Sequence, residues 1–176
     1  MAIERLKVCL NGGRRRDEHP AVPITPAELA TAAADAVAAG AEAVHMHPRD
    51  SAGAQSLDPD RIAAAVTAVR HSCAGVAVGV STGLWITDGD PERRPVAAAD
   101  EILARLDDLG IDGPRLLHGD EAACWPLVAH AGRLGLPTRI GLEDITVGPA
   151  GEPVADDADL VREALKVWTA RRYATR

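Results

Sequence analysis

The sequence contains no phenylalanine and few other aromatic residues. Its 176 residues include one Tyr and three Trp, although hydrophobic residues make up 47% of the chain. That hydrophobic fraction is ordinary for a globular protein and excludes a mostly disordered chain. Small side chains bury little area each, but they let helices lie close to a sheet. We therefore expect a globular core built mainly from small aliphatic residues.

The sequence also lacks long apolar runs, basic stripes and cysteine pairs. No apolar run approaches the ~18 residues of a membrane-spanning helix, and the first ten residues carry charge where a signal peptide would be apolar. The net charge is −7, with Arg14–Arg16 as the tightest basic cluster, so we expect no nucleic-acid partner. Cys9, Cys73 and Cys124 form no C-x-x-C motif, which is typical of reduced thiols in a cytoplasmic protein.

Short apolar runs alternate with longer amphipathic runs along the chain. The five expected strands are Lys7–Leu10, Ala43–His47, Val76–Ser81, Arg115–His118 and Thr138–Leu142. The expected helices begin at Thr25, Asp58, Ala97, Glu121 and Asp156 and end near Gly40, Arg70, Leu109, Leu134 and Arg172. This alternation predicts an α/β fold with a parallel sheet. We expect one domain, 1–176, with a possible internal deletion junction in the polar stretch at 88–95.

The clearest helix start is at Thr25. Thr25 is the expected N-cap, Pro26 occupies the first helical position and Glu28 follows three residues after the cap. This pattern predicts a capping box.

Polar residues follow the expected strands, where parallel α/β folds carry their reactive groups. Side chains alternate along a strand, so His45 and His47 should point to one face, about 6–7 Å apart. Two imidazoles at that spacing can bind one metal ion, and at the polar end of an apolar strand we favour this over histidines satisfied by loop contacts. A third ligand is expected from Glu143 or Asp144, because catalytic zinc sites often combine two His with one carboxylate.

The Glu143–Asp144 pair leaves alternatives open. Adjacent strand residues face opposite sides, so we expect one of the two to be the direct ligand and the other a base or a supporting group. Both could instead cap the segment that follows. Arg139 should share the Glu143 face, either to bind a substrate carboxylate or to pair with a nearby acid. Ser81, Thr82, Gly83 and His118 also lie at expected strand ends.

Four segments resemble, in order, segments of the β-keto acid cleavage enzymes, which are also called 3-keto-5-aminohexanoate cleavage enzymes. They are Asn11-Gly12-Gly13 with the following residues 19–28, Val44-His45-Met46-His47-Pro48-Arg49-Asp50, Ser81-Thr82-Gly83, and Arg139-Ile140-Gly141-Leu142-Glu143-Asp144. The second and fourth together are far more specific than either one alone.

The resemblance implies a zinc-dependent (β/α)8 barrel that converts a β-keto acid and acetyl-CoA into acetoacetate and a new acyl-CoA. It implies that Zn²⁺, or a similar divalent metal, is bound by the residues matching the family's ligands, His45, His47 and Glu143. It also implies that Asp144, Arg139 and Ser81 act on the substrate. The further residues expected to bind substrate are Asn11, Gly12, Arg14, Thr82, Gly83 and His118.

The sequence departs from the family pattern in two ways. Arg14 stands where some members carry a carboxylate, so we expect a neutral or anionic substrate tail to be preferred. The chain is also shorter than the at least ~200 residues of a full barrel. Aligned by its motifs, it retains the family's strands one to three, seven and eight. This predicts an incomplete, TIM-barrel-derived arc of about five strands, shortened by roughly three βα units and ordered 7-8-1-2-3.

An open arc exposes strand edges that invite pairing with another chain. We therefore expect a homodimer or a homotetramer. Two other functions stay open at this point. One is a catalytically impaired metal-binding or oligomerisation remnant of the enzyme, and the other is a metal-dependent, aldolase-type lyase acting on a small keto acid.

Overall fold

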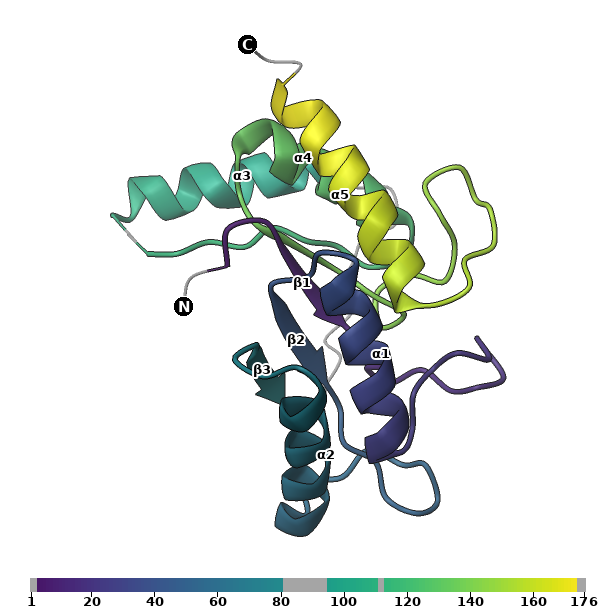
Figure 1. Ribbon diagram of the computed structural model, residues 1–176. Coiled ribbons are helices and arrows are strands. Elements are labelled where there is room, and N and C mark those ends of the chain that lie inside the picture. The colour runs from purple at the N-terminus through teal and green to yellow at the C-terminus, as the bar shows by residue number, and fades with distance from the viewer. Residues whose placement is uncertain (1–2, 81–94, 111–112, 174–176) are drawn as a thin grey trace.

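Strands and helices alternate along the chain (Figure 1). The computed structural model describes residues 3–80, 95–110 and 113–173. In chain order the elements are β1 (Leu6–Cys9), α1 (Pro26–Ala38), β2 (Ala43–Met46), α2 (Pro59–Ser72), β3 (Ala77–Val80), α3 (Pro95–Asp108), a short 3₁₀ helix (Glu121–Ala123), α4 (Cys124–Leu134), β4 (Thr138–Ile140) and α5 (Asp157–Tyr173). Ser81, Thr82, Gly83 and most of the 88–95 stretch lie outside the described residues.

Within the described residues, the four strands form one parallel sheet in the order β3-β2-β1-β4. β1 pairs with β2, which follows it in sequence, and with β4, which comes more than a hundred residues later. The predicted parallel α/β arrangement is confirmed, and so is the predicted order of these four strands. The sheet is open, consistent with an incomplete barrel.

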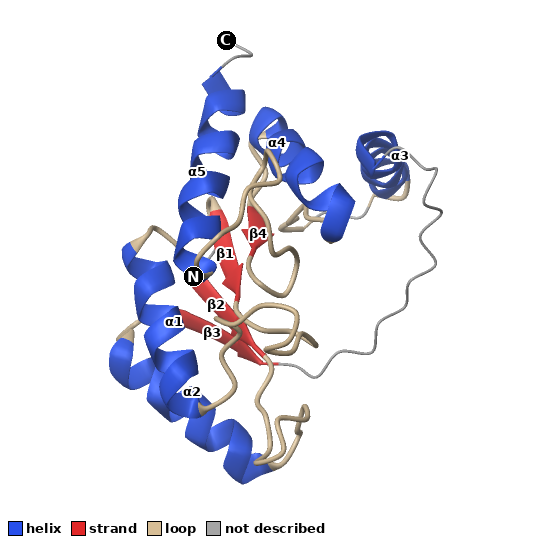
Figure 2. Ribbon diagram, turned by 90° about the vertical axis from the view of Figure 1, so that its right-hand side faces the viewer, coloured by secondary structure: helices blue, strands red, loops and turns tan. Residues whose placement is uncertain are grey.

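Helices α1, α2 and α5 lie along one side of the sheet (Figure 2). The interior between them is apolar, and Val8, Val44 and Ile140 of three neighbouring strands are fully buried in it. Leu29 of α1 and Leu160 of α5 are buried in the same core. Each strand therefore presents its opposite side chains to the concave face, where the polar residues gather.

The fourth predicted strand, Arg115–His118, is not a strand in the structure. Leu117 donates one backbone hydrogen bond to the carbonyl of Pro137 at 3.0 Å. Pro137 has no N–H of its own, and the Thr138 hydroxyl occupies the Leu117 carbonyl at 2.7 Å. The segment therefore lies beside the start of β4 without forming a ladder.

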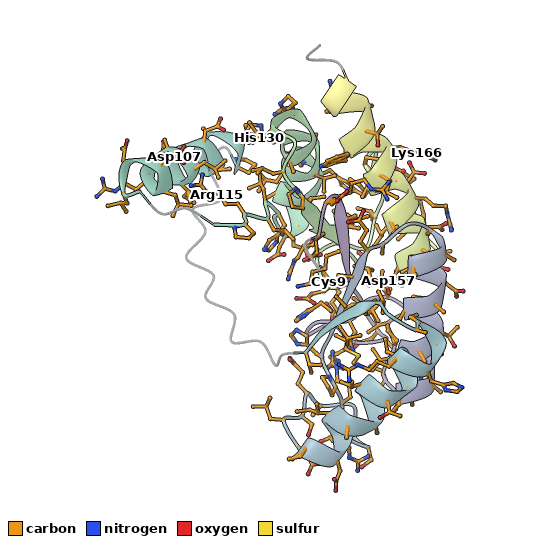
Figure 3. All side chains as sticks on the ribbon, turned by 60° about the vertical axis from the view of Figure 1, so that its left-hand side comes forward. Cys9, Asp107, Arg115, His130, Asp157 and Lys166 are labelled. Carbon is orange, nitrogen blue, oxygen red and sulfur yellow. The ribbon has the colours of Figure 1, made fainter. Side chains whose placement is uncertain are left out.

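Polar contacts attach α3 to the rest of the protein. Nε2 of His130 on α4 lies 2.6 Å from a carboxylate oxygen of Asp100 on α3. Arg115 forms an ion pair with Asp107 at 2.8 Å, and both residues are labelled with His130 in Figure 3. His130 thus joins two helices.

The predicted capping box at the start of α1 is confirmed. The Glu28 N–H donates to the Thr25 hydroxyl, and a Glu28 carboxylate oxygen accepts from the Thr25 N–H at 2.9 Å. Pro26 occupies the first turn, where a missing N–H costs nothing. None of the helices described here combines the length and apolar character needed to cross a bilayer.

Candidate metal centre

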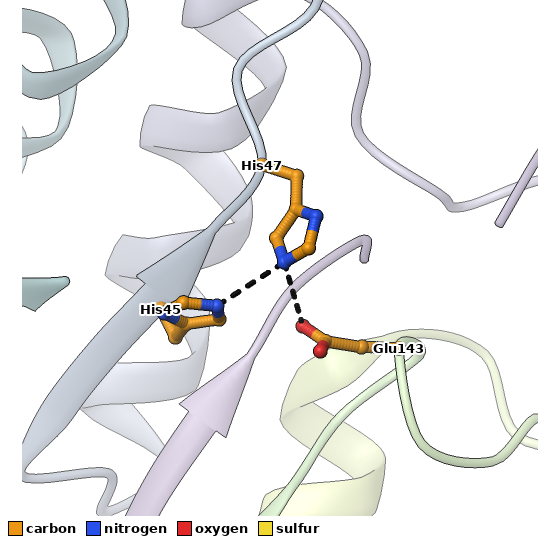
Figure 4. Close-up of side chains that lie close together, drawn as sticks. All are labelled: His45, His47 and Glu143. Carbon is orange, nitrogen blue, oxygen red and sulfur yellow. Dashed lines mark hydrogen bonds and ion pairs between the residues drawn. The ribbon is translucent and has the colours of Figure 1, made fainter. Parts of the chain in front are cut away.

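His45 and His47 point to the same face of β2, as the alternation predicts. Their Nε2 atoms lie 3.2 Å apart, and the two rings meet edge to face with centroids 5.1 Å apart (Figure 4). Met46 between them is fully buried on the opposite face. β2 ends at Met46, so His47 is the first residue beyond the strand.

Two amides hold His47 in this orientation. Nδ1 of the imidazole lies 2.6 Å from Oε1 of Gln55. Because an amide oxygen is only an acceptor, Nδ1 is the ring nitrogen that donates to Gln55, and Nε2 is the one that faces the site. The side chain of Asn11 bonds both the N–H and the carbonyl of His47, at 2.9 and 3.0 Å, and also donates to Pro23. The ring and the backbone of His47 are thus fixed independently.

Glu143 brings a carboxylate to the histidines from the turn after β4, on the other side of β1. Its Oε2 atom lies 3.8 Å from Nε2 of His47 (Figure 4), and this buried oxygen has no hydrogen-bond partner within the part of the chain that the structure describes. Its other oxygen, Oε1, accepts from Arg139 at 3.2 Å. The carboxylate is thereby anchored on one side and open toward the imidazoles on the other.

A glycine makes room for this carboxylate. Gly12 has a φ of +47°, and a Cβ atom built there would lie 2.3 Å from Cγ of Glu143. Any larger residue would meet both backbone strain and the Glu143 side chain. The predicted Gly12 is therefore part of the geometry that admits Glu143.

Glu143 and Asp144 lie in a turn rather than in a strand, which corrects the predicted strand boundary. β4 ends at Ile140, and the N–H of Asp144 turns back to the carbonyl of Gly141 at 2.8 Å. The alternation expected for the pair therefore does not apply. Glu143 faces the histidines, while Asp144 bonds Arg139 at 2.5 Å and is fully buried.

A side chain of α5 holds this turn in place. Asp157, at the first position of α5, accepts a hydrogen bond from the N–H of Leu142 at 2.8 Å. Burial raises the pKa of Asp157 well above its ordinary value. The residue that positions the Glu143 turn therefore comes from the following helix.

Burial also controls the charge of the site. It lowers the pKa of His45 to about 3, with further lowering from Lys7, His47 and Arg139. Neutral imidazole is the form that binds metal, so His45 is ready to do so at neutral pH. Burial raises the pKa of Asp144 well above its ordinary value, although Arg139 acts in the opposite direction.

Arg14 and His118 lie around this centre but are not among the three converging side chains. Arg14 forms ion pairs with Glu121 and with Glu18, which balance its charge. His118 lies with Asp120 and Asp144, their ligand atoms all within 4.8 Å of one another. The substrate contacts predicted for Asn11, Arg14 and His118 remain predictions.

Sequence reasoning missed Gln55 and Asp157. Gln55 lies eight residues after His47 in an irregular loop, and no sequence pattern connects the two. Asp157 follows Asp156 at the start of a helix. Acidic residues are common at that position because they interact favourably with the helix dipole, so the sequence gives no sign of a further role. The contact of Asp157 with Leu142 depends on tertiary structure alone.

The chain is similar to one known protein family and to several individual proteins. Residues 5–109 match the family described as beta-keto acid cleavage enzyme. The chain is 34% identical over 92 residues to a 3-keto-5-aminohexanoate cleavage enzyme of Fusobacterium nucleatum, covering 52% of this chain and 34% of the relative. It is 39% identical over 80 residues to a 3-oxoadipate:acetyl-CoA acetyltransferase of Cupriavidus necator, covering 44% and 28%.

A 3-keto-5-aminohexanoate cleavage enzyme of Acetoanaerobium sticklandii is 32% identical over 93 residues, covering 52% of this chain and 34% of the relative. The chain thus spans about a third of the length of these relatives. The family match includes His45 and His47 but stops before Arg139, Glu143 and Asp144. The fold is what brings these last three residues to the histidines.

Proposed function

The chain belongs to the β-keto acid cleavage enzyme family, and we propose that it transfers an acyl group from a β-keto acid to CoA with the help of a bound divalent metal, Zn²⁺ in the first instance. In this reaction R–CO–CH₂–COO⁻ and acetyl-CoA give acetoacetate and R–CO–S–CoA. The bond between the keto carbon and C2 of the substrate breaks, and the acetyl group takes the place of the released acyl group. The observation that carries the proposal is the convergence of His45, His47 and Glu143.

The donor set fits a divalent cation. Two imidazoles and one carboxylate are a common ligand set for catalytic zinc. Among the described residues, the buried Oε2 of Glu143 has no hydrogen-bond partner, and His47 directs Nε2 to the same space at 3.8 Å. A buried carboxylate oxygen left unpaired is costly, and a cation would satisfy it. We therefore assign His45, His47 and Glu143 as the metal ligands.

A divalent metal at this position would supply Lewis-acid stabilisation of the negative charge that develops on the keto oxygen. Arg139 is suited to hold the anionic end of the substrate, because its buried Nε–H finds no acceptor among the described residues. Asp144 is suited to accept a proton, because burial raises its pKa and its Oδ2 has no hydrogen-bond partner in the same part of the chain. Arg139 orients Asp144 through the opposite oxygen, Oδ1.

Further substrate contacts are proposed from the family resemblance. Ser81, Thr82 and Gly83 directly follow Val80, the last residue of β3, in the sequence and lie outside the described residues. His118 is the other expected contact. A CoA thioester and a small β-keto acid are the proposed substrates.

The test is direct product analysis with metal-stripped and Zn²⁺-loaded protein. We expect acetoacetate and a new acyl-CoA to form from acetyl-CoA and a β-keto acid only after metal is restored. His47→Ala should reduce both metal content and turnover by at least about 100-fold, because it removes a direct ligand. His71→Ala changes an exposed histidine at the end of α2 and should alter neither.

Other outcomes would identify the alternatives. Metal binding without product would favour a non-catalytic metal-binding member of the family. Cleavage of a keto acid in the absence of CoA would favour an aldolase-type lyase. Turnover that is independent of metal and unaffected by His47→Ala would contradict the proposal.

A further inference from the structure

A second group of potential ligands lies next to the candidate metal centre. His118, Asp120 and Asp144 each offer one ligand atom, and these atoms all lie within 4.8 Å of one another. His118 and Asp120 come from the segment before the short 3₁₀ helix, and Asp144 comes from the turn after β4. We refer to these three residues as the second cluster.

Each member of the second cluster has a buried polar atom that finds no hydrogen-bond partner in residues 3–80, 95–110 and 113–173. These atoms are Nδ1 of His118, Oδ1 of Asp120 and Oδ2 of Asp144. Asp144 is fully buried, so its open oxygen has no access to bulk water. A buried polar atom without a partner is costly, and each of these three residues carries one. Because the three residues also each offer a ligand atom within 4.8 Å of the others, they indicate a missing ligand.

The local contacts explain why these three atoms are not hydrogen-bonded to the residues around them. Asp120 occupies the N-cap position of the 3₁₀ helix, yet its side chain makes no capping hydrogen bond. Arg139 donates to Oδ1 of Asp144 and lies 3.7 Å from Oδ1 of Asp120. Arg139 thus binds only Oδ1 of Asp144, and Oδ2 remains available to a ligand of the second cluster.

We propose that the second cluster is a second divalent-cation site, distinct from the His45–His47–Glu143 centre. One imidazole and two carboxylates match the ligand preferences of Zn²⁺ and Mn²⁺. Arg139 pairs with Asp144, Glu143 and Asp120, so its one positive charge is shared among three carboxylates, and the group keeps a net negative charge that favours a cation. This assignment needs only the described residues and does not depend on the reaction proposed above.

A cation in the second cluster would also slow the acyl transfer proposed above. It would occupy Oδ2 of Asp144, the oxygen that we propose as the proton acceptor. The second equivalent of metal should therefore lower turnover, and this consequence alone rests on the proposed function.

The test is the zinc content of the full chain after metal removal and equilibrium dialysis against Zn²⁺ alone. We expect two Zn²⁺ per wild-type chain, one for Asp120→Asn, one for His47→Ala and none for the double variant. Asp120→Asn should lower the affinity for the second Zn²⁺ at least tenfold. Asp120 lies near the surface, with a side chain 40% exposed, so the variant should still fold.

The matched control is Asp108→Asn, which changes an exposed aspartate at the end of α3 and should retain both equivalents. His118→Ala should behave as Asp120→Asn does. A wild-type content of one Zn²⁺ would overturn the proposal, and so would a second equivalent that survives both Asp120→Asn and His118→Ala. Loss of the first equivalent in His47→Ala bears only on the His45–His47–Glu143 centre, so the two proposals fail separately.

Discussion

At the scale of single residues, several polar side chains act by holding other side chains in place. Gln55 fixes the ring of His47, Asn11 fixes its backbone, and Asp157 fixes the turn that carries Glu143. None of these three converges on the candidate metal centre itself. Such supporting contacts determine ligand orientation, and their loss typically weakens metal binding by about 10–100-fold.

Gln55 offers a clean test of this effect. We expect Gln55→Ala to weaken Zn²⁺ binding by about 10–100-fold, because His47 loses the acceptor that keeps the proton on Nδ1. Gln55→Glu retains an acceptor oxygen and should bind Zn²⁺ about as well as the wild type. Competition against a chromophoric chelator measures both affinities, and equal weakening in the two variants would argue against a role for this contact.

Gly12 tests the space around Glu143. Gly12→Ala should reduce Zn²⁺ affinity at least tenfold, because the new Cβ would lie 2.3 Å from Cγ of Glu143. Gly135→Ala introduces a comparable backbone strain at a φ of +69°, with no atom within 4 Å of the new Cβ. The control should lose about 1–2 kcal/mol of stability without losing affinity. Affinity that falls equally in both variants would assign the effect to general destabilisation.

At the scale of helices and strands, the start of α1 illustrates how local sequence fixes an element. The capping hydrogen bonds, that from the Thr25 N–H foremost, lower the pKa of Glu28 from 4.5 to about 2. A carboxyl group with a lowered pKa stabilises the folded state fully above its ordinary value of 4.5. That contribution is then lost as the pH falls toward 2.

Glu28→Gln should remove this pH dependence. We expect wild-type protein to lose more thermal stability than the variant between pH 4.5 and about 2, because only the wild type must protonate a capping carboxylate. Thermal unfolding of the metal-free proteins across this range measures the difference. Parallel curves for the two proteins would show that the carboxylate contributes nothing to the pH response.

The elements also show what a sequence can and cannot predict. The strands that carry His45 and Arg139 follow from apolar runs, and α1 follows from its capping box. The failure of Arg115–His118 to become a strand depends on Pro137 and on the Thr138 hydroxyl, which act only once the two segments lie side by side. Which carboxylate faces the histidines depends on a turn that begins at Gly141, and strand alternation could not reveal it.

At the scale of the whole molecule, the sheet has an open edge at β3. Within the described residues β3 pairs only with β2, so its outer backbone groups are available to another strand. Exposed edges of this kind are usually covered in stable proteins. The predicted homodimer or homotetramer would cover it.

Light scattering coupled to size-exclusion chromatography tests this prediction. We expect a mass of two or four chains that persists on dilution, since pairing through an edge protects backbone groups as well as apolar side chains. A monodisperse monomer over the same concentration range would contradict the prediction.

The position of β1 between β2 and β4 has a consequence for biosynthesis. β1 gains one neighbour from residues 43–46 and the other from residues 138–140. His47 and the residues that orient it, Asn11 and Gln55, are translated well before Glu143. The candidate metal centre can therefore assemble only after residues 138–144 have followed them out of the ribosome.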